Sequence, residues 1–181
     1  ETYSIKDFGE GIISIIEKEK SNKKIKNINI IGHSLGGQVA AYVASERTEL
    51  INNLIMIDTF IRPPGYDPKD HESGPLRMIK YYPDKVSILK RFRLLPSQEC
   101  LNGWFVRYIA EHSIKETEEG WRWKFDDAMF NGLERLFGYE FTFGYPTLFV
   151  YGAESLLMSG NILPNIKKTY SDIMEFEEIA D

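Results

Sequence analysis

Apolar residues recur near the start of this chain at a helical spacing and then gather in short continuous runs. The helical spacing predicts a helix from about Ser4 to Lys18, and Ser4 and Asp7 resemble a capping box at its start. The charged run from Glu17 to Lys24 is typical of a solvated turn. Residues Ile25 to Ile31 then predict a strand, and its near-continuous isoleucine favours a parallel sheet that is covered on both faces.

The pattern continues as helix and strand. Small residues favour a closely packed helix from about Gly36 to Ser45, and Leu54 to Ile57 predicts a buried strand that ends at Asp58. This order predicts a βαβ crossover between parallel strands. Three later elements are predicted in the same way: a strand over Pro146–Gly152, a helix over Ile162–Tyr170 interrupted near its start by Pro164, and a last strand over Ile173–Ile179.

The stretch from Arg62 to Gly138 differs in character. It opens with a loop rich in proline and glycine and continues with short helical patterns rich in arginine and aromatic residues. Alternating apolar and polar residues from Gly120 to Asp126 indicate a short extended piece or a turn. This stretch therefore interrupts the alternation of strands and helices.

The first predicted strand and the helix after it enclose Gly32-x-Ser34-x-Gly36. Strand, sharp turn and helix are the context of a nucleophile elbow, in which a strained serine lifts its Oγ clear of the sheet. Gly32 and Gly36 would lie where strand and helix pass too closely for a Cβ. The Leu35 N–H would point at a developing oxyanion from the positive end of the helix. The plainer alternative is a serine that only caps the helix.

The run Gly32-His33-Ser34-Leu35-Gly36-Gly37 resembles the elbow of the α/β-hydrolase fold, in a form common among esterases and other serine hydrolases. The resemblance implies an α/β fold with a mostly parallel sheet and an inserted helical cap. Its domain division would be 1–61 for the first part of the core, 62–138 for the cap, and 139–181 for the second part of the core. Aromatic residues that could line an acyl pocket are Phe60, Trp104, Trp121, Trp123 and Phe130. The alternative is that these residues only pack the cap onto the core.

In this family an acidic residue orients the catalytic histidine. The resemblance implies Asp58 as that acid, because it follows the strand after the elbow. Other members place the acid after the next core strand, where Glu154 is the alternative here. Ser155 stands where many relatives have aspartate, which favours Asp58.

The base should be a histidine, and the chain has three. His33 lies beside the nucleophile, where relatives often have histidine near the substrate, whereas His71 and His112 fall in the inserted stretch. The resemblance places the base on the loop after the last strand, at or just beyond Asp181, and several strands before Ser4. The expectation is a fragment that lacks its base and one oxyanion donor, and whose elbow strand is an open sheet edge.

The composition of the chain limits its possible domain number, partners, location and cofactors. With 181 residues, 43% of them hydrophobic, the chain is one globular domain or most of one. Its net charge of −5 gives no reason to expect nucleic acid or an anionic membrane as a partner, and no apolar run reaches transmembrane length. Its single cysteine, Cys100, excludes an internal disulfide and is compatible with a cytoplasmic location. No clustered histidine and cysteine ligands suggest a metal, and no cofactor is implied.

Together these features predict serine-dependent hydrolysis of a small carboxylic ester or related acyl substrate. Two alternatives stay open: acyl transfer or C–C bond hydrolysis by the same triad, and a binding module that keeps the fold without the base. A second copy of the chain or a further segment is expected to cover the open sheet edge.

Overall fold

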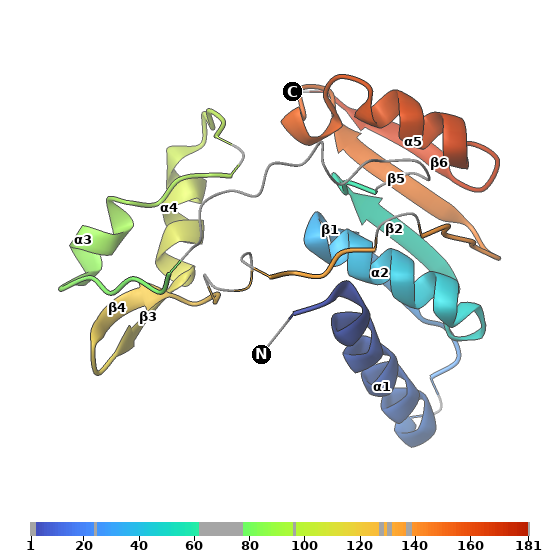
Figure 1. Cartoon of the computed structure of the whole chain (residues 1–181), viewed down its shortest axis with the longest axis horizontal. Coiled ribbons are helices and arrows are strands. Elements are labelled where there is room, and N and C mark those ends of the chain that lie inside the picture. The colour runs from blue at the N-terminus through green and yellow to red at the C-terminus, as the bar shows by residue number, and fades with distance from the viewer. Residues whose placement is uncertain are drawn as a thin grey trace. The chain divides into compact units, whose positions relative to one another are not determined.

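The computed structural model describes residues 3–23, 25–61, 78–95, 97–126, 129, 132–136 and 139–180 (Figure 1). They fall into two compact units. The core unit comprises the described residues up to 61 and from 134 onward, and the middle unit comprises those from 78 to 133. The middle unit lies inside the stretch 62–138 that was predicted as a cap, and the predicted division of the chain stays a prediction.

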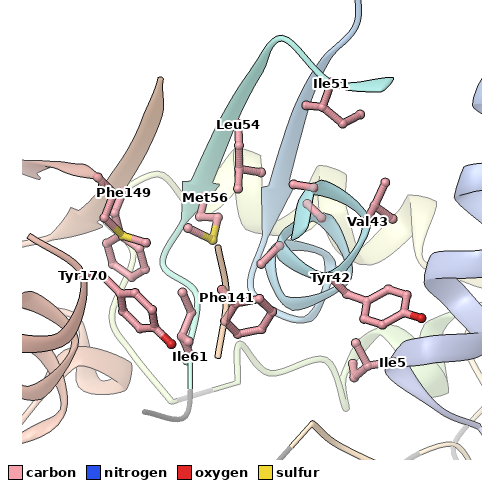
Figure 2. Close-up of a cluster of buried hydrophobic side chains, with 14 of the residues drawn as sticks. Ile5, Tyr42, Val43, Ile51, Leu54, Met56, Ile61, Phe141, Phe149 and Tyr170 are labelled. Carbon is pink, nitrogen blue, oxygen red and sulfur yellow. The ribbon is translucent and has the colours of Figure 1, made fainter. Parts of the chain in front are cut away.

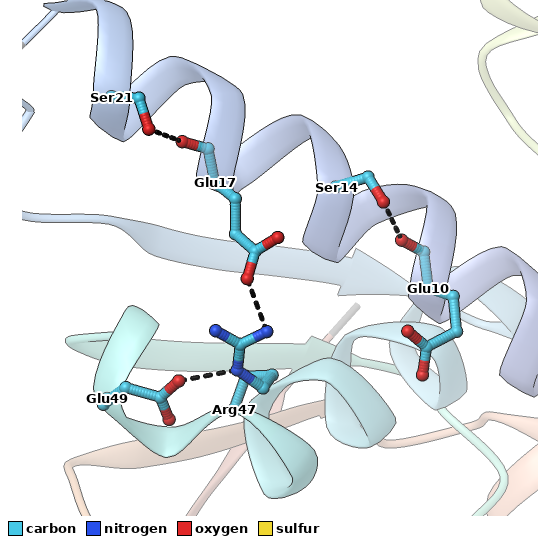
Figure 3. Close-up of polar contacts among 6 residues, drawn as sticks. All are labelled: Glu10, Ser14, Glu17, Ser21, Arg47 and Glu49. Carbon is cyan, nitrogen blue, oxygen red and sulfur yellow. Dashed lines mark hydrogen bonds and ion pairs between the residues drawn. The ribbon is translucent and has the colours of Figure 1, made fainter.

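Helix α1 (Ile5–Lys23) opens the core unit and begins with the predicted cap. Ser4 Oγ accepts a hydrogen bond from the Asp7 amide at 2.9 Å and donates one to the Asp7 carboxylate at 2.7 Å. The predicted turn from Glu17 to Lys24 is wrong, because α1 continues through most of it. Lysine and glutamate are good helix formers, and Glu17 finds a partner in Arg47, at 2.6 Å (Figure 3).

Four parallel strands form the sheet of the core unit, in the order β1-β2-β5-β6. Their bounds are β1 Asn29–His33, β2 Asn53–Ile57, β5 Thr147–Gly152 and β6 Glu175–Ile179. The first strand was predicted at residues 25–31, but its pairing with β2 begins only at Asn29. Just before this point the Ile28 amide donates to the side chain of Asn52, at 2.8 Å. β1 then runs two residues further than predicted.

The helices of the core unit pack on one face of this sheet. Helix α2 (Leu35–Glu46) follows β1, α1 packs against α2, and α5 (Ile162–Tyr170) lies between β5 and β6 in the chain. α5 is not interrupted at Pro164, because a proline in the first helical turn removes no hydrogen bond. Two short 3-10 turns, Thr48–Leu50 and Leu156–Met158, complete the unit.

The buried core lies between these helices and the sheet (Figure 2). Leu54, Met56 and Phe149 are fully buried on the helix side of their strands. The alternate residues face the other way, and Ile31 of β1 is 65% exposed. The expectation of a sheet covered on both faces is therefore not met by the described residues. Among them, β1 also has a neighbouring strand on one side alone, as expected for an open edge.

The middle unit combines two helices with a hairpin. Helices α3 (Lys85–Leu89) and α4 (Gly103–His112) precede the antiparallel strands β3 (Ile114–Thr117) and β4 (Gly120–Trp123). The extended piece predicted from Gly120 is β4, whereas β3 was not predicted. No helix in the described part of the chain is long and apolar enough to cross a membrane.

Candidate active site

Ser34 occupies the sharp turn between β1 and α2. Its backbone has φ 51° and ψ −119°, in the left-handed region that residues other than glycine rarely adopt. The Ser34 amide donates to the carbonyl of Ile57 at 2.9 Å, which ties this turn to the end of β2. The Ser34 side chain makes no capping hydrogen bond to α2, which counts against the plain capping alternative. Strain of this kind is typical of functional sites.

One of the two motif glycines is required by close packing and the other is not. A Cβ on Gly32 would lie 2.4 Å from the carbonyl oxygen of Gly36, so strand and helix do pass too closely there for a side chain. A Cβ on Gly36 would meet open space, so the predicted crowding at that position is wrong. The crowded position is Gly37, whose Cβ would fall 1.8 Å from Thr59 Oγ1.

Leu35 is the first residue of α2. An amide in the first turn of a helix has no carbonyl four residues earlier within that helix to receive its proton. The amides of Gly37 and Gln38 already donate to the Ser34 carbonyl, at 3.0 and 3.3 Å. Leu35 therefore lies at the positive end of the helix, and its role as an oxyanion donor stays a prediction.

Asp58 comes directly after β2 and is the second non-glycine residue with a positive φ, of 46°, in the described chain. Its amide donates to the Val150 carbonyl at 2.8 Å. Its Oδ1 is buried and has no hydrogen-bond partner among the described residues. A buried carboxylate oxygen costs free energy unless a donor reaches it. Asp58 therefore has unused capacity to accept a hydrogen bond, as an acid that orients a histidine requires.

Glu154, the alternative acid, lies in the turn after β5 and is exposed. The neighbouring Ser155 has a structural role, because its Oγ accepts the Leu157 amide at 3.2 Å and caps the following 3-10 turn. Both candidate acids thus lie at the carboxyl edge of the sheet, where Ser34 also lies.

The two histidines that the structure describes, His33 and His112, lie at the ends of β1 and α4. His33 ends β1 with an exposed side chain, as the last residue before Ser34. His112 ends α4 in the middle unit, where its Nδ1 lies 2.8 Å from the Tyr108 carbonyl oxygen and its ring lies 4.0 Å from the Tyr108 ring. His71 lies outside the described residues.

The aromatic residues predicted to line a pocket divide between the units. Phe60 is half-buried in the core unit and lines a cavity of about 10 Å³, room for about one water molecule. In the middle unit, Trp121 pairs through its backbone with Tyr82, and the Trp123 ring lies 5.9 Å from that of Phe92. Phe130 lies outside the described residues. Substrate contacts by His33, Phe60, Trp121 and Trp123 stay a prediction.

Two features of the site were missed from the sequence. They are the contact between Gly37 and Thr59 and the strained backbone of Asp58. The second glycine of Gly36-Gly37 was the available signal for the contact with Thr59. Nothing in the local pattern marks the strained backbone of Asp58. Within the described ranges, no group of three or more histidine, cysteine, aspartate and glutamate side chains could hold a metal ion.

Comparison with known proteins identifies the fold of the chain. The family model described as alpha/beta hydrolase fold matches residues 6–180. The sn-1-specific diacylglycerol lipase ABHD11 of Danio rerio is 26% identical over 149 residues, which are 78% of this chain and 46% of the lipase. The chain thus spans about half the length of that relative.

Two solved structures illustrate the similarity of fold. The thioesterase domain from the curacin biosynthetic pathway has a TM-score of 0.68 at 21% identity, over 99% of this chain and 67% of that one. E-2-(acetamidomethylene)succinate hydrolase has a TM-score of 0.66 at 18% identity, over 100% of this chain and 68% of that one. At these identities the structures show a shared fold.

Proposed function

Because this chain belongs to the alpha/beta hydrolase fold family, we propose that it is the part of a serine hydrolase that carries the nucleophile, Ser34. The substrate class is a carboxylic ester or a related acyl compound. The curated relative described above is named as a diacylglycerol lipase, which supports an acyl substrate. No cofactor takes part in the proposed reaction.

In the proposed mechanism Ser34 Oγ attacks the acyl carbonyl carbon while a histidine removes the hydroxyl proton. The carbonyl oxygen gains negative charge, and the Leu35 amide donates a hydrogen bond to it. The same histidine then protonates the leaving alcohol, and water releases the acyl group from Ser34. Asp58 orients the histidine and stabilises its positive charge, through a carboxylate whose Oδ1 is buried and unpaired among the described residues.

The observation that carries this proposal is the backbone of Ser34. A serine with φ 51° that neither continues the strand nor caps the helix is held in a costly conformation. A structural turn at this point would be served more easily by glycine. A nucleophile explains the strain, because the turn lifts its hydroxyl above the sheet edge.

A covalent probe tests the proposal in the full-length protein. A fluorophosphonate should label Ser34, located by mass spectrometry of the digested protein, and Ser34→Ala should abolish both the labelling and hydrolysis of a short activated ester. The expected loss of turnover is about 1,000-fold or more. Unchanged hydrolysis by Ser34→Ala, with circular dichroism showing an intact fold, would exclude this nucleophile.

Substrate profiling separates the alternatives within the same chemistry. Acyl transfer predicts a product that depends on an added alcohol or amine, and C–C bond hydrolysis predicts turnover of a diketone in place of an ester. A binding module predicts that no probe labels the full-length protein at Ser34, although the fold is intact.

A further inference from the structure

Thr59 comes directly after Asp58 and is fully buried, so it can influence a substrate only through other residues. Its hydroxyl donates a hydrogen bond to the carbonyl of Ile57, at 3.1 Å. The Ser34 amide donates to the same carbonyl oxygen, at 2.9 Å. A carbonyl oxygen has two lone pairs and can accept both bonds. One oxygen atom at the end of β2 thus receives a bond from the Ser34 turn and a bond from Thr59.

The bond between the Thr59 hydroxyl and the Ile57 carbonyl spans Asp58. The backbone of Asp58 has φ 46°, a conformation that costs free energy in a residue other than glycine. Because the bond joins the two neighbours of Asp58 to each other, it closes a short ring that favours this conformation. The hydroxyl proton is used in that bond and is not directed at the Asp58 carboxylate. Asp58 Oδ1, which is buried and unpaired among the described residues, therefore keeps its capacity to accept from a histidine.

Thr59 also supports the helix that follows Ser34. A Cβ on Gly37 would fall 1.8 Å from Thr59 Oγ1, so the backbone of α2 packs directly on this side chain. The Gly37 amide in turn donates to the Ser34 carbonyl, at 3.0 Å. Burying a hydroxyl costs free energy that burying a valine of the same shape does not. Valine would therefore serve for packing alone, and the hydroxyl indicates that the bond to Ile57 is what requires threonine here.

We propose that Thr59 is a positioning residue, which acts through the Ile57 carbonyl to hold Ser34 and Asp58 in the relative position that proton transfer requires. This role rests on the proposed function, since a nucleophile and an acid at these two positions are what Thr59 aligns. Alignment matters because a displacement of about 1 Å can lower a catalysed rate about 100-fold. Since Thr59 is fully buried, its effect belongs in kcat and not in KM.

Thr147 provides a matched control in the same sheet. It is the first residue of β5, it is buried, and its hydroxyl donates to the carbonyl two residues earlier, that of Tyr145, at 3.3 Å. Thr59 and Thr147 therefore share residue type, burial and the kind of local bond. Because β5 is parallel to β2, Thr147 lies at the amino edge of the sheet, opposite the edge that carries Ser34 and Asp58. Valine at either position removes one hydroxyl and keeps the shape of the side chain.

Kinetics of the full-length protein with a short activated ester test this role. Thr59→Val should lower kcat at least about tenfold and change KM less than about twofold. Thr147→Val should leave both constants within about twofold. Thr59→Ser keeps the hydroxyl but loses a buried methyl group, so it should keep at least about a third of kcat while being less stable in urea. Unchanged kcat in Thr59→Val, or an equal loss in Thr147→Val, would overturn the proposal. So would a folded Thr59→Ser variant whose kcat falls about tenfold.

Amide hydrogen exchange of the same proteins gives a readout that does not depend on turnover. The Ser34 amide should exchange at least about fivefold faster in Thr59→Val than in the unchanged protein, and at the unchanged rate in Thr147→Val. An unchanged rate in Thr59→Val would overturn the role of Thr59, even where Ser34→Ala abolishes hydrolysis. Hydrolysis that survives Ser34→Ala would instead overturn the proposed function, and with it the catalytic role of Thr59, whatever the exchange rates are.

Discussion

The Ser34 amide lies 2.9 Å from the Ile57 carbonyl oxygen, to which it donates a hydrogen bond. Because Ile57 ends β2, this bond fixes the turn that carries Ser34 against the strand end that leads into Asp58. Both Ser34 and Asp58 have positive φ values, so two strained residues lie at neighbouring strand ends. Such strain persists only where the surrounding structure enforces it. The packing of Gly32 and Gly37 is what does so here.

Gly37 should therefore be far less tolerant of a side chain than Gly36. Gly37→Ala places a Cβ 1.8 Å from Thr59 Oγ1, and Thr59 is fully buried, so we expect a loss of at least about 2 kcal/mol in the free energy of unfolding. Gly36→Ala enters open space in a helix and should stabilise by up to about 1 kcal/mol. Urea denaturation of both variants measures the difference. Equal effects would show that the helix is not held where the structure has it.

The choice between the two acids can be made by kinetics. Asp58→Asn should lower ester hydrolysis by the full-length protein about 1,000-fold or more, because the amide no longer stabilises the charged histidine. Glu154→Gln, a change of the same kind at an exposed position, should leave the rate within about twofold. The reverse ranking would assign the acid to Glu154.

Local patterns predicted those parts of the site that depend on neighbours in sequence. The elbow at Ser34 follows from a strand, a turn and a helix that adjoin one another, and so does the capping box of Ser4 and Asp7. The crowding of Gly37 depends on Thr59, a residue 22 positions away that β2 brings beneath α2. Such a contact exists only after the sheet has formed, so no local pattern indicates it.

Two further differences between the predicted and the observed secondary structure also arise from contacts between residues that are not neighbours in sequence. The stretch Glu17–Lys24 is polar enough for a turn, yet it stays helical where Glu17 meets Arg47 at the end of α2 (Figure 3). The strand β3 is short and carries Lys115 and Glu116, so it is defined by its pairing with β4 and has no apolar run of its own.

Tyr42 should make the stability of the core unit sensitive to alkali. Its ring is buried under α1, and its hydroxyl donates to Glu10 at 2.9 Å. Burial first, and the bond to Glu10 second, raise the pKa of Tyr42 well above its ordinary value of 10.0. The unfolded chain would release this proton near pH 10 while the folded chain keeps it. Unfolding is therefore favoured, and the free energy of unfolding falls, as the pH rises above about 10.

Denaturation by urea across that pH range tests this linkage. Tyr42→Phe keeps the buried ring but removes the ionisable group, so its stability should fall less steeply above pH 10 than that of the unchanged protein. Tyr108→Phe, at an exposed position of α4, is the control and should leave the slope unchanged. An identical slope in Tyr42→Phe would show that other groups cause the alkaline loss.

The 181-residue chain should self-associate through β1. This strand is at the edge of the described sheet, and Ile31 on its uncovered face is 65% exposed. We propose that a second copy of the chain covers this region. Ile31→Ser should raise the monomer fraction measured by analytical ultracentrifugation, whereas Ile15→Ser, at a similarly exposed position of α1, should not. No gain in monomer with Ile31→Ser would contradict this.

The 181-residue chain alone should not hydrolyse esters. A serine hydroxyl is a weak nucleophile without a positioned base. His33 is exposed at the end of β1, and His112 contacts Tyr108 within its own helix. Stabilisation of the oxyanion by the Leu35 amide cannot replace the base, because the amide does not remove the hydroxyl proton. An assay with a short activated ester, comparing the chain with its Ser34→Ala variant, should find no difference between them. Turnover that depends on Ser34 would contradict this, and its loss in either His71→Ala or His112→Ala would then identify the base.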